Sequence, residues 1–257
     1  MSWSRAVAVV AALVWLSPSS PAQVFTDNFN TGTDTGWTHY QPLSTLGAPG
    51  TWSFPNGNSY RIQAAHTPAL ATVGPGRAAS YRGDFTYSNF FVAADLVNWD
   101  NTVPQSFGLA GRLSSIGLGT TNGYLFLYDT TGGTTPFDIY RVTGENVTSI
   151  GNGNLTLTPG QTYRLTFEGD TAGNFTGRVF QGANLLLTVT NGTADTTYAS
   201  GFSGLLVAED TSGAIAGADA TWDNYLSAPV APVPEPATWA LTLVGAAGAW
   251  AVRRFRR

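Results

Sequence analysis

The carboxylates come first, because their spacing decides whether the chain could hydrolyse a glycosidic bond. That reaction uses two carboxyl groups, about 5–5.5 Å apart in enzymes that retain configuration. Residues i and i+2 of a strand share a face, so such a pair would appear as closely spaced acids. Glu168-Gly169-Asp170 comes nearest, but its surroundings predict a solvated hairpin turn. The adjacent Glu209 and Asp210 would point to opposite faces of a strand. We therefore expect no catalytic acid pair, and keep a polysaccharide hydrolase with an unrecognised pair as the alternative.

Other catalytic chemistries find little support in the residue types. The run Gly201-Phe202-Ser203-Gly204 lacks the last glycine of a nucleophile elbow, and no helix is predicted after it. The sequence has no cysteine, which excludes thiol nucleophiles, thiolate metal sites and disulfide bonds. Its histidines, His39 and His66, are too far apart for a helical zinc motif. The sequence thus predicts a protein that is not an enzyme.

Sugar binding is the chemistry that the polar loops favour. Many sugar sites stack a ring face on an exposed aromatic side chain, while carboxylates and amides bond the hydroxyl groups. Trp99-Asp100-Asn101, on a polar loop after an apolar strand, has this combination. Tyr128-Asp129, at the end of a predicted strand, has it too. We expect both patches to be candidate glycan contacts, with ordinary rim aromatics and solvated turn carboxylates as the alternative interpretation.

The elements that would carry these residues are strands. Short apolar or aromatic-rich runs occupy residues 90–97, 107–113, 123–128 and 137–142. Residues 162–168 alternate, and turns around residues 169–173 and 182–183 separate them from two further runs, at 175–181 and 184–190. This last group predicts a β-meander. With 30 glycines and no convincing helix between residues 23 and 234, the pattern favours an all-β sandwich or barrel.

The N-terminal end has the pattern of a secretory signal peptide. Arg5 precedes an 11-residue apolar run at 6–16, and small residues at Ser20 and Ala22 precede Gln23. The run is too short to span a bilayer, although a single N-terminal anchor is the alternative. We expect residues 1–22 to be removed and the protein to be exported.

The C-terminal end combines a short motif, an apolar segment and a basic stop. Pro234-Glu235-Pro236 precedes the apolar run 237–252, and Arg253, Arg254, Arg256 and Arg257 follow it. As a helix the run is slightly shorter than the ~20 residues of a comfortable span. Clustered arginines hold their side of such a segment in the cytoplasm. We expect a transmembrane helix over 237–252, preceded by a Pro-rich linker at 228–232.

This end resembles the PEP-CTERM sorting signal of Gram-negative bacteria. The resemblance covers residues 233–257, about a tenth of the chain. It implies recognition of the motif by an exosortase, which is a membrane-embedded cysteine protease. It also implies an intermediate in the inner membrane and a final place in the cell envelope or extracellular matrix, where such proteins are linked to exopolysaccharide and biofilm. It says nothing about the domain that is carried.

The net charge of the middle segment limits the classes of molecule that it could bind. The whole chain has a net charge of −4 and no lysine, and Arg5 and the four C-terminal arginines lie in the two ends. The middle segment is therefore more acidic than the whole chain. An acidic domain without a basic patch is a poor nucleic-acid binder. We expect no nucleic-acid partner and name extracellular polysaccharide as the candidate.

Residues 23–227 resemble bacterial laminin-G/concanavalin-like jelly-roll domains. The resemblance lies in the order of several short motifs: residues 25–29, 85–97 with Asp95, 108–112, 123–124, 160–165, 201–205 and 220–225. It implies an antiparallel jelly-roll β-sandwich whose first and last strands lie side by side. Relatives with this fold often hold one Ca²⁺ through oxygen ligands. The terminal patches supply such ligands in Asp27, Asp219, Asp223 and Asn224, with strand-end hydrogen bonding as the alternative role.

Overall fold

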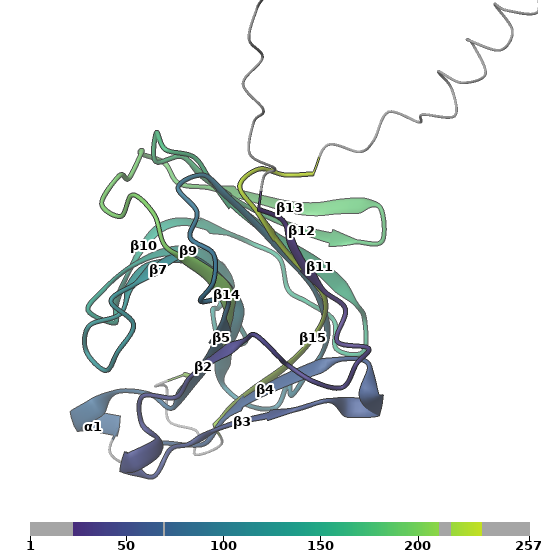
Figure 1. Cartoon of the computed structure of the whole chain (residues 1–257), viewed down its shortest axis with the longest axis vertical. Coiled ribbons are helices and arrows are strands. Elements are labelled where there is room, and N and C mark those ends of the chain that lie inside the picture. Colours follow the sequence, from purple (N-terminus) through teal and green to yellow (C-terminus); the bar gives the residue numbers. More distant parts are fainter. Residues whose placement is uncertain (1–22, 69, 211–216, 233–257) are drawn as a thin grey trace, which may run out of the picture.

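The structure, a computed structural model, describes residues 23–68, 70–210 and 217–232. Within these ranges the chain folds into two antiparallel sheets packed face to face (Figure 1). The predicted all-β, antiparallel jelly-roll sandwich is therefore confirmed. The predicted signal peptide, sorting motif and transmembrane segment lie outside the described residues.

The first sheet has eight strands in the described residues. Their bounds are β1 Phe25–Asp27, β3 Gly50–Ser53, β4 Tyr60–Ala64, β6 Phe90–Trp99, β11 Tyr163–Gly169, β12 Phe175–Gln181, β13 Asn184–Thr190 and β15 Ala218–Ala228. They run in the order β13-β12-β11-β6-β15-β4-β3, and β1 pairs with the second half of β15. This pairing confirms the expectation that the first and last strands of the domain lie side by side.

The second sheet has seven strands in the same part of the chain. Their bounds are β2 Thr38–Tyr40, β5 Arg77–Tyr81, β7 Gln105–Ser114, β8 Asn122–Asp129, β9 Phe137–Thr143, β10 Asn146–Gly153 and β14 Phe202–Glu209. They run in the order β10-β9-β8-β7-β14-β5-β2. The sheet curls strongly, and its hollow side faces away from the first sheet (Figure 1).

The hydrophobic runs of the sequence become the central strands. The four runs at 90–97, 107–113, 123–128 and 137–142 lie within β6, β7, β8 and β9. The predicted meander is β11, β12 and β13, paired in succession. These predictions are confirmed because alternation and β-branched or aromatic side chains suit a pleated surface with one buried face.

Two details differ from the sequence expectations. A one-turn helix, α1 (Leu70–Val73), and two short 3-10 turns, Ser44–Leu46 and Pro55–Gly57, interrupt segments expected to hold no helix. Strand β15 extends to Ala228, which pairs with Phe91 and so belongs to the sheet rather than to the predicted linker.

Among the described residues, no helix has the length and apolar character needed to cross a membrane.

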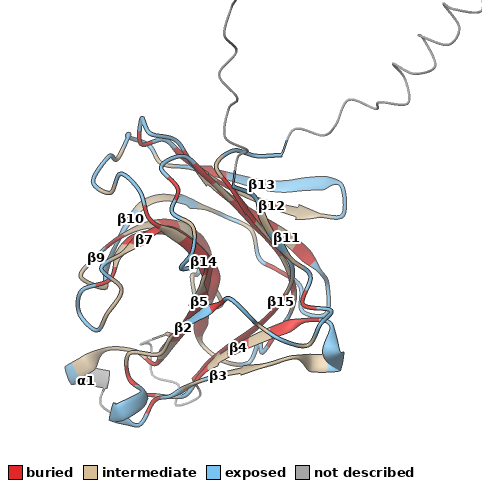
Figure 2. Cartoon of the chain, in the orientation of Figure 1, coloured by how far each residue is buried: buried red, intermediate tan, exposed pale blue. Residues whose placement is uncertain are grey.

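The core between the sheets is aromatic. Phe126 of the curled sheet stacks on Phe137 of the same sheet and on Phe167 of the opposite sheet, and Phe107 packs edge-on against Trp222. Buried residues form continuous stripes along the inner strands of both sheets (Figure 2). Every residue of this core cluster lies within 29–225, so a fragment of residues 23–232 retains all of the core contacts described.

Candidate functional site

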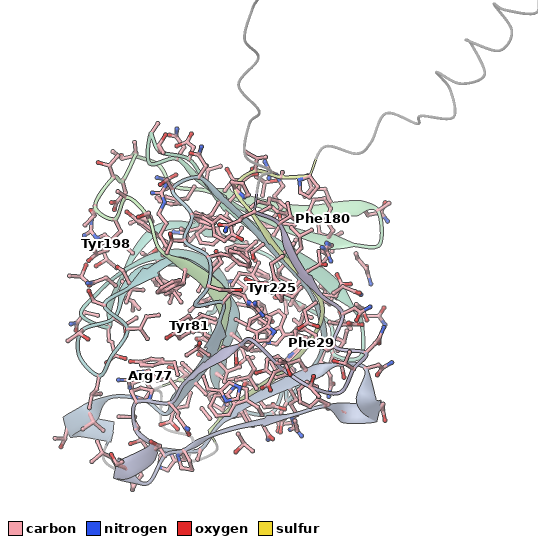
Figure 3. All side chains as sticks on the ribbon, viewed as in Figure 1. Phe29, Arg77, Tyr81, Phe180, Tyr198 and Tyr225 are labelled. Carbon is pink, nitrogen blue, oxygen red and sulfur yellow. The ribbon has the colours of Figure 1, made fainter. Side chains whose placement is uncertain are left out.

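The hollow side of the curled sheet carries a groove of about 530 Å³. Ligand sites of small molecules commonly have volumes of about 300–1,000 Å³. Arg77 and Tyr81 lie on this side of the sheet (Figure 3). The volume of the groove is thus in the range of small-molecule ligand sites.

The floor of the groove is a second apolar cluster, separate from the core between the sheets. Leu125 and Leu127 of β8 and Val142 of β9 are 5–8 % exposed and point into it. Leu206 of β14 and Ile116 are half-buried beside them. Since successive residues of a strand point to opposite faces, Tyr124, Phe126 and Tyr128 of β8 fill the core while the intervening leucines line the groove.

Three tyrosines supply aromatic surface to the groove walls. Tyr40 comes from β2, Tyr81 from β5 and Tyr140 from β9, and all three are half-buried. The Tyr81 ring packs against Phe202 with ring centroids 5.4 Å apart. Burial, reinforced by the nearby Asp138 carboxylate, raises the pKa of the Tyr140 phenol. The Tyr140 phenol is therefore a neutral hydrogen-bonding group on an apolar ring, a combination suited to ligands with both apolar and hydroxyl faces.

An ion pair bridges the two sides of the hollow, and we name it the latch. Arg77 of β5 donates from Nε and Nη2 to the two carboxylate oxygens of Glu145, at 2.8 and 2.7 Å. Glu145 lies in the turn between β9 and β10, and it also accepts hydrogen bonds from the Tyr40 hydroxyl and the Gly119 N–H. Burial alone would raise the pKa of the Glu145 carboxyl. The hydrogen bonds and the positive charge of Arg77 lower it by more, so the pKa lies below its ordinary value. The carboxylate is held ionised, and the latch ties together strands from opposite edges of the sheet.

Two carboxylates converge on one hydroxyl at the edge of the groove. Thr131 Oγ1 lies 2.8 Å from Asp129 Oδ1 and is also hydrogen-bonded to Asp210 Oδ2. Both aspartates line the groove. Because they contact the same oxygen, the two carboxylates are at most two hydrogen-bond lengths apart. This is the nearest that the groove comes to an acid pair, with a hydroxyl group between the two members.

The predicted stacking aromatics are not at the surface. Trp99 is 4 % exposed and Tyr128 is 2 % exposed, and both pack in the core with Phe107. The Trp99 indole N–H donates to Asn101 Oδ1, and the Tyr128 hydroxyl accepts the N–H of Leu157. The prediction that these two rings present a free face to a sugar is wrong, because Trp99 of β6 and Tyr128 of β8 both point into the core.

The three polar residues of the two predicted patches make different contacts. Asp100 accepts the Thr102 N–H and hydroxyl in a local turn, as the alternative interpretation expected. The Asn101 side-chain oxygen accepts the hydrogen bond from the Trp99 indole. Asp129 instead lies in the groove wall. The structure therefore brings one of the five predicted glycan contacts into the candidate site.

The four predicted calcium ligands do not form one site. Asp219 is 7 % exposed and pairs with Arg61 Nη2 at 2.6 Å. The two carboxylate oxygens of Asp27 accept hydrogen bonds from the Phe29 N–H and the Trp37 indole N–H. Among the described residues, no three acidic or histidine side chains are arranged to hold a metal ion. This set does not fit the cation, and calcium binding stays a prediction of the sequence alone.

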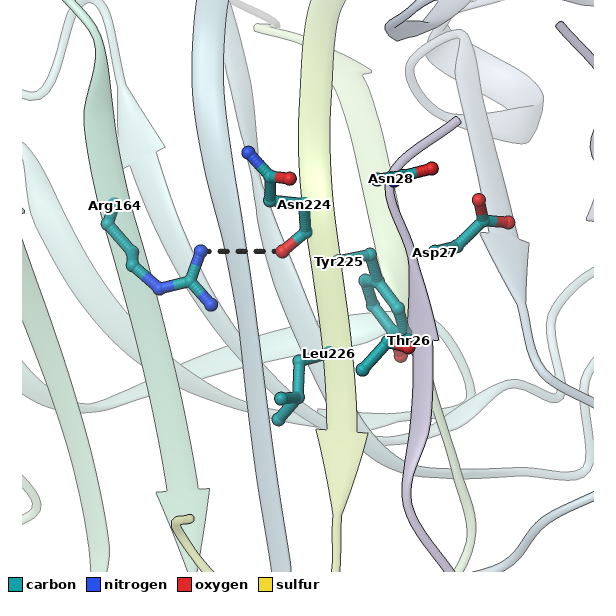
Figure 4. Close-up of a pocket in the computed structure, with 7 residues that line it drawn as sticks. All are labelled: Thr26, Asp27, Asn28, Arg164, Asn224, Tyr225 and Leu226. Atoms are coloured by element: carbon teal, nitrogen blue, oxygen red, sulfur yellow. Dashed lines mark hydrogen bonds between the residues drawn. The ribbon is translucent and has the colours of Figure 1, made fainter. Parts of the chain in front are cut away.

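Asp27 and Asn224 do line one shallow hollow, of about 430 Å³, shown in Figure 4. Its cationic wall is Arg164, which donates to Asp95 Oδ1 at 2.8 Å and to the Asn224 carbonyl. Asn224 also donates to Asp95 Oδ2. Burial, with help from the Asp95 and Asp27 carboxylates, raises the pKa of Asp223. These side-chain contacts tie β15 to β6 and β11, whereas the first and last strands are joined by the backbone pairing of β1 with β15.

The sequence did contain a signal for the groove. In residues 123–128 the odd-numbered and the even-numbered positions are both free of polar or charged side chains other than tyrosine. Both faces of this strand must therefore be covered, either by the rest of the protein or by a ligand. The latch has no such signal, because Arg77 and Glu145 are 68 residues apart. Residues 234–236 and the four C-terminal arginines lie outside the described residues.

No protein-family model matches the sequence, and the search of curated proteins finds no relative. Similar solved structures include the carbohydrate-binding module CBM66 from Bacillus subtilis, with TM-score 0.51, 17 % identity, and coverage of 76 % of this chain and 96 % of that one. The basic winged bean lectin crystallised with Tn-antigen has TM-score 0.53, 9 % identity, and coverage of 80 % and 98 %. A GlcNAcα1-4Gal-releasing endo-β-galactosidase from Clostridium perfringens has TM-score 0.51 and 13 % identity, and covers 85 % of this chain and 66 % of its own. At these identities the chain shares with them a lectin-like β-sandwich fold.

Proposed function

We propose that this chain is a non-catalytic glycan-binding protein whose binding site is the groove of the curled sheet. The observation that carries the proposal is the groove itself: an apolar hollow of about 530 Å³ with tyrosines in its walls and carboxylates at its edge. Apolar lining with a few placed polar groups is the usual composition of a ligand site. The likeness of the fold to a carbohydrate-binding module and a lectin supports the same class of ligand.

A binding isotherm with a groove-filling variant tests this function. The fragment 23–232 is titrated with neutral oligosaccharides of glucose, galactose, mannose and fructose. Leu206 is half-buried and lines the groove, so Leu206→Trp places the larger ring in the hollow with little strain on the core. We expect it to weaken binding of the retained sugar at least about tenfold, since truncating or blocking a central contact costs 1.4 kcal/mol or more.

The matched control is Leu185→Trp on β13. Leu185 is 53 % exposed on the other sheet and outside the groove, so this variant should bind as the parent does. Equal weakening by both variants, or binding that Leu206→Trp leaves intact, would contradict the placement of the site.

A hydrolase is the second candidate, and the pair Asp129 and Asp210 is the observation that favours it. The two carboxylates share the Thr131 hydroxyl at the edge of the groove. Retaining glycosidases hold their carboxyl groups about 5–5.5 Å apart. We expect the purified fragment to release no reducing ends from neutral polysaccharides. Turnover that is lost in both Asp129→Asn and Asp210→Asn would reverse this ranking.

We also propose that the protein reaches its place of action by export and sorting. Residues 1–22 would direct secretion, and Pro234-Glu235-Pro236 with the apolar run 237–252 would present the tail to an exosortase in the inner membrane. The domain would then bind extracellular polysaccharide in the envelope or matrix. Fractionation of tagged protein tests the route, because cytosolic protein with its first residues intact would contradict it.

A further inference from the structure

The floor of the groove is aliphatic rather than aromatic. Leu113, Leu125, Leu127, Val142 and Leu206 form it, and the tyrosines stand in the walls. A bare sugar packed on this floor would turn hydroxyl groups toward leucines that cannot hydrogen-bond them. A buried hydroxyl without a partner is costly, whereas methylene groups gain from the same contact. The floor is therefore suited to a chain of CH₂ groups.

The apolar track continues to the mouth of the groove. Val147 on β10 lines the groove and is 56 % exposed, an unusual exposure for a large apolar residue. The polar groups lie apart from the leucines, in the latch and around Thr131. One hollow thus has an apolar part that would take a chain and polar parts that would take a hydroxylated head group.

The charges of the lining exclude an anionic head group. Asp129, Glu145 and Asp210 line the groove with their carboxylates, against one guanidinium, Arg77, which is already paired with Glu145. Glu209 also borders the groove, but its carboxylate is buried and bonded to His66 and the Thr67 N–H. An additional carboxylate, phosphate or sulfate would meet like charges in a partly desolvated site. Neutral ligands avoid this repulsion, and their hydroxyl groups can donate to the carboxylates.

We propose that the groove binds a neutral sugar that carries an alkyl or acyl chain, with the chain on the leucine floor and the sugar among the polar groups. This inference rests on the proposed glycan-binding function and specifies its ligand class. It predicts that affinity depends on the chain as much as on the sugar.

The test compares three probes on the fragment 23–232 by calorimetric titration: octyl β-glucoside below its critical micelle concentration, methyl β-glucoside and octyl sulfate. We expect octyl glucoside to saturate one site and to bind at least about tenfold more tightly than methyl glucoside, because each buried methylene adds to affinity. Octyl sulfate should bind at least about tenfold more weakly than octyl glucoside, because of the carboxylates. Leu206→Trp should abolish the advantage of the octyl chain, and Leu185→Trp should leave it unchanged.

The other outcomes separate this inference from the proposed function. If methyl and octyl glucoside bind equally, or if plain oligosaccharides bind in the groove while octyl glucoside does not, the chain has no role and glycan binding stands. If octyl sulfate binds as well as octyl glucoside, the charge argument fails and the inference is overturned. If octyl glucoside binds equally to Leu206→Trp, the chain lies elsewhere and the inference is also overturned.

Discussion

At the scale of single residues, Arg112 shows how a charge becomes part of the core. It is 1 % exposed, and its guanidinium donates to the carbonyl oxygens of Ser88, Tyr198 and Asp170. The rings of Phe90, Tyr124 and Phe175 lie within 6 Å of its charged carbon. Burial lowers the pKa of this guanidinium. One side chain thus satisfies carbonyl groups from three separate loops.

We predict that Arg112→Ala lowers the free energy of unfolding by about 3 kcal/mol, because it leaves buried carbonyl groups without donors. Arg178 pairs with Glu168 on the outer face of the other sheet, where both side chains are about a third exposed. Its replacement by alanine should cost less than about 1 kcal/mol. Urea unfolding of the two variants measures the difference, and equal stabilities would refute the structural role of Arg112.

At the scale of elements, the latch between the β9–β10 turn and β5 should make stability depend on pH. The pKa of Glu145 is lowered in the folded protein, so the folded state binds this proton more weakly than the unfolded chain does. The stabilisation is complete above the ordinary glutamate pKa of about 4.3 and is lost as pH falls through the lower, folded value.

We predict that Glu145→Gln is less stable than the parent at neutral pH and loses less stability on acidification. Melting temperatures of the two proteins across the acid range measure this. Parallel pH curves for parent and variant would show that the latch contributes nothing to the acid dependence.

The strands could be predicted from sequence, but the places where their side chains end up could only partly be predicted. Alternation located β6 to β9 and the meander because the physical cause, one buried face, is local to each strand. The polar residues beside Trp99 and Tyr128 predict that these rings lie at the surface, yet core packing turns both inward. Near Asn224 the register of β15 shifts and the backbone takes a positive φ, which no alternation pattern reveals.

The candidate site could not be predicted from short stretches of sequence, because its residues come together only in the complete seven-stranded sheet. Tyr40, Arg77 and Glu145 come from three parts of the chain and meet because the seven-stranded sheet curls. The curl depends on pairing among all the strands, so short-range patterns do not contain it. Asp129 was the exception: a carboxylate at the end of a predicted strand, which the fold brings to the groove wall.

At the scale of the whole molecule, the two faces of the sandwich have different surfaces. The outer face of the eight-stranded sheet carries ion pairs such as Arg164–Asp95 and Arg178–Glu168, which suit contact with water. The hollow of the curled sheet is apolar at its floor and acidic at its edge. The first and last strands of the domain, β1 and β15, pair with each other. We therefore expect one binding face on this domain, in the hollow of the curled sheet.

The most direct measurement of the central claim is the map of NMR chemical-shift changes in the labelled fragment 23–232 during titration with a neutral oligosaccharide. The account predicts saturable changes at groove residues such as Tyr81, Leu127, Tyr140 and Leu206, and none at Arg164 or Arg178 on the outer face. Changes confined to the outer face or to the hollow around Asn224, with the groove unaffected, would contradict it.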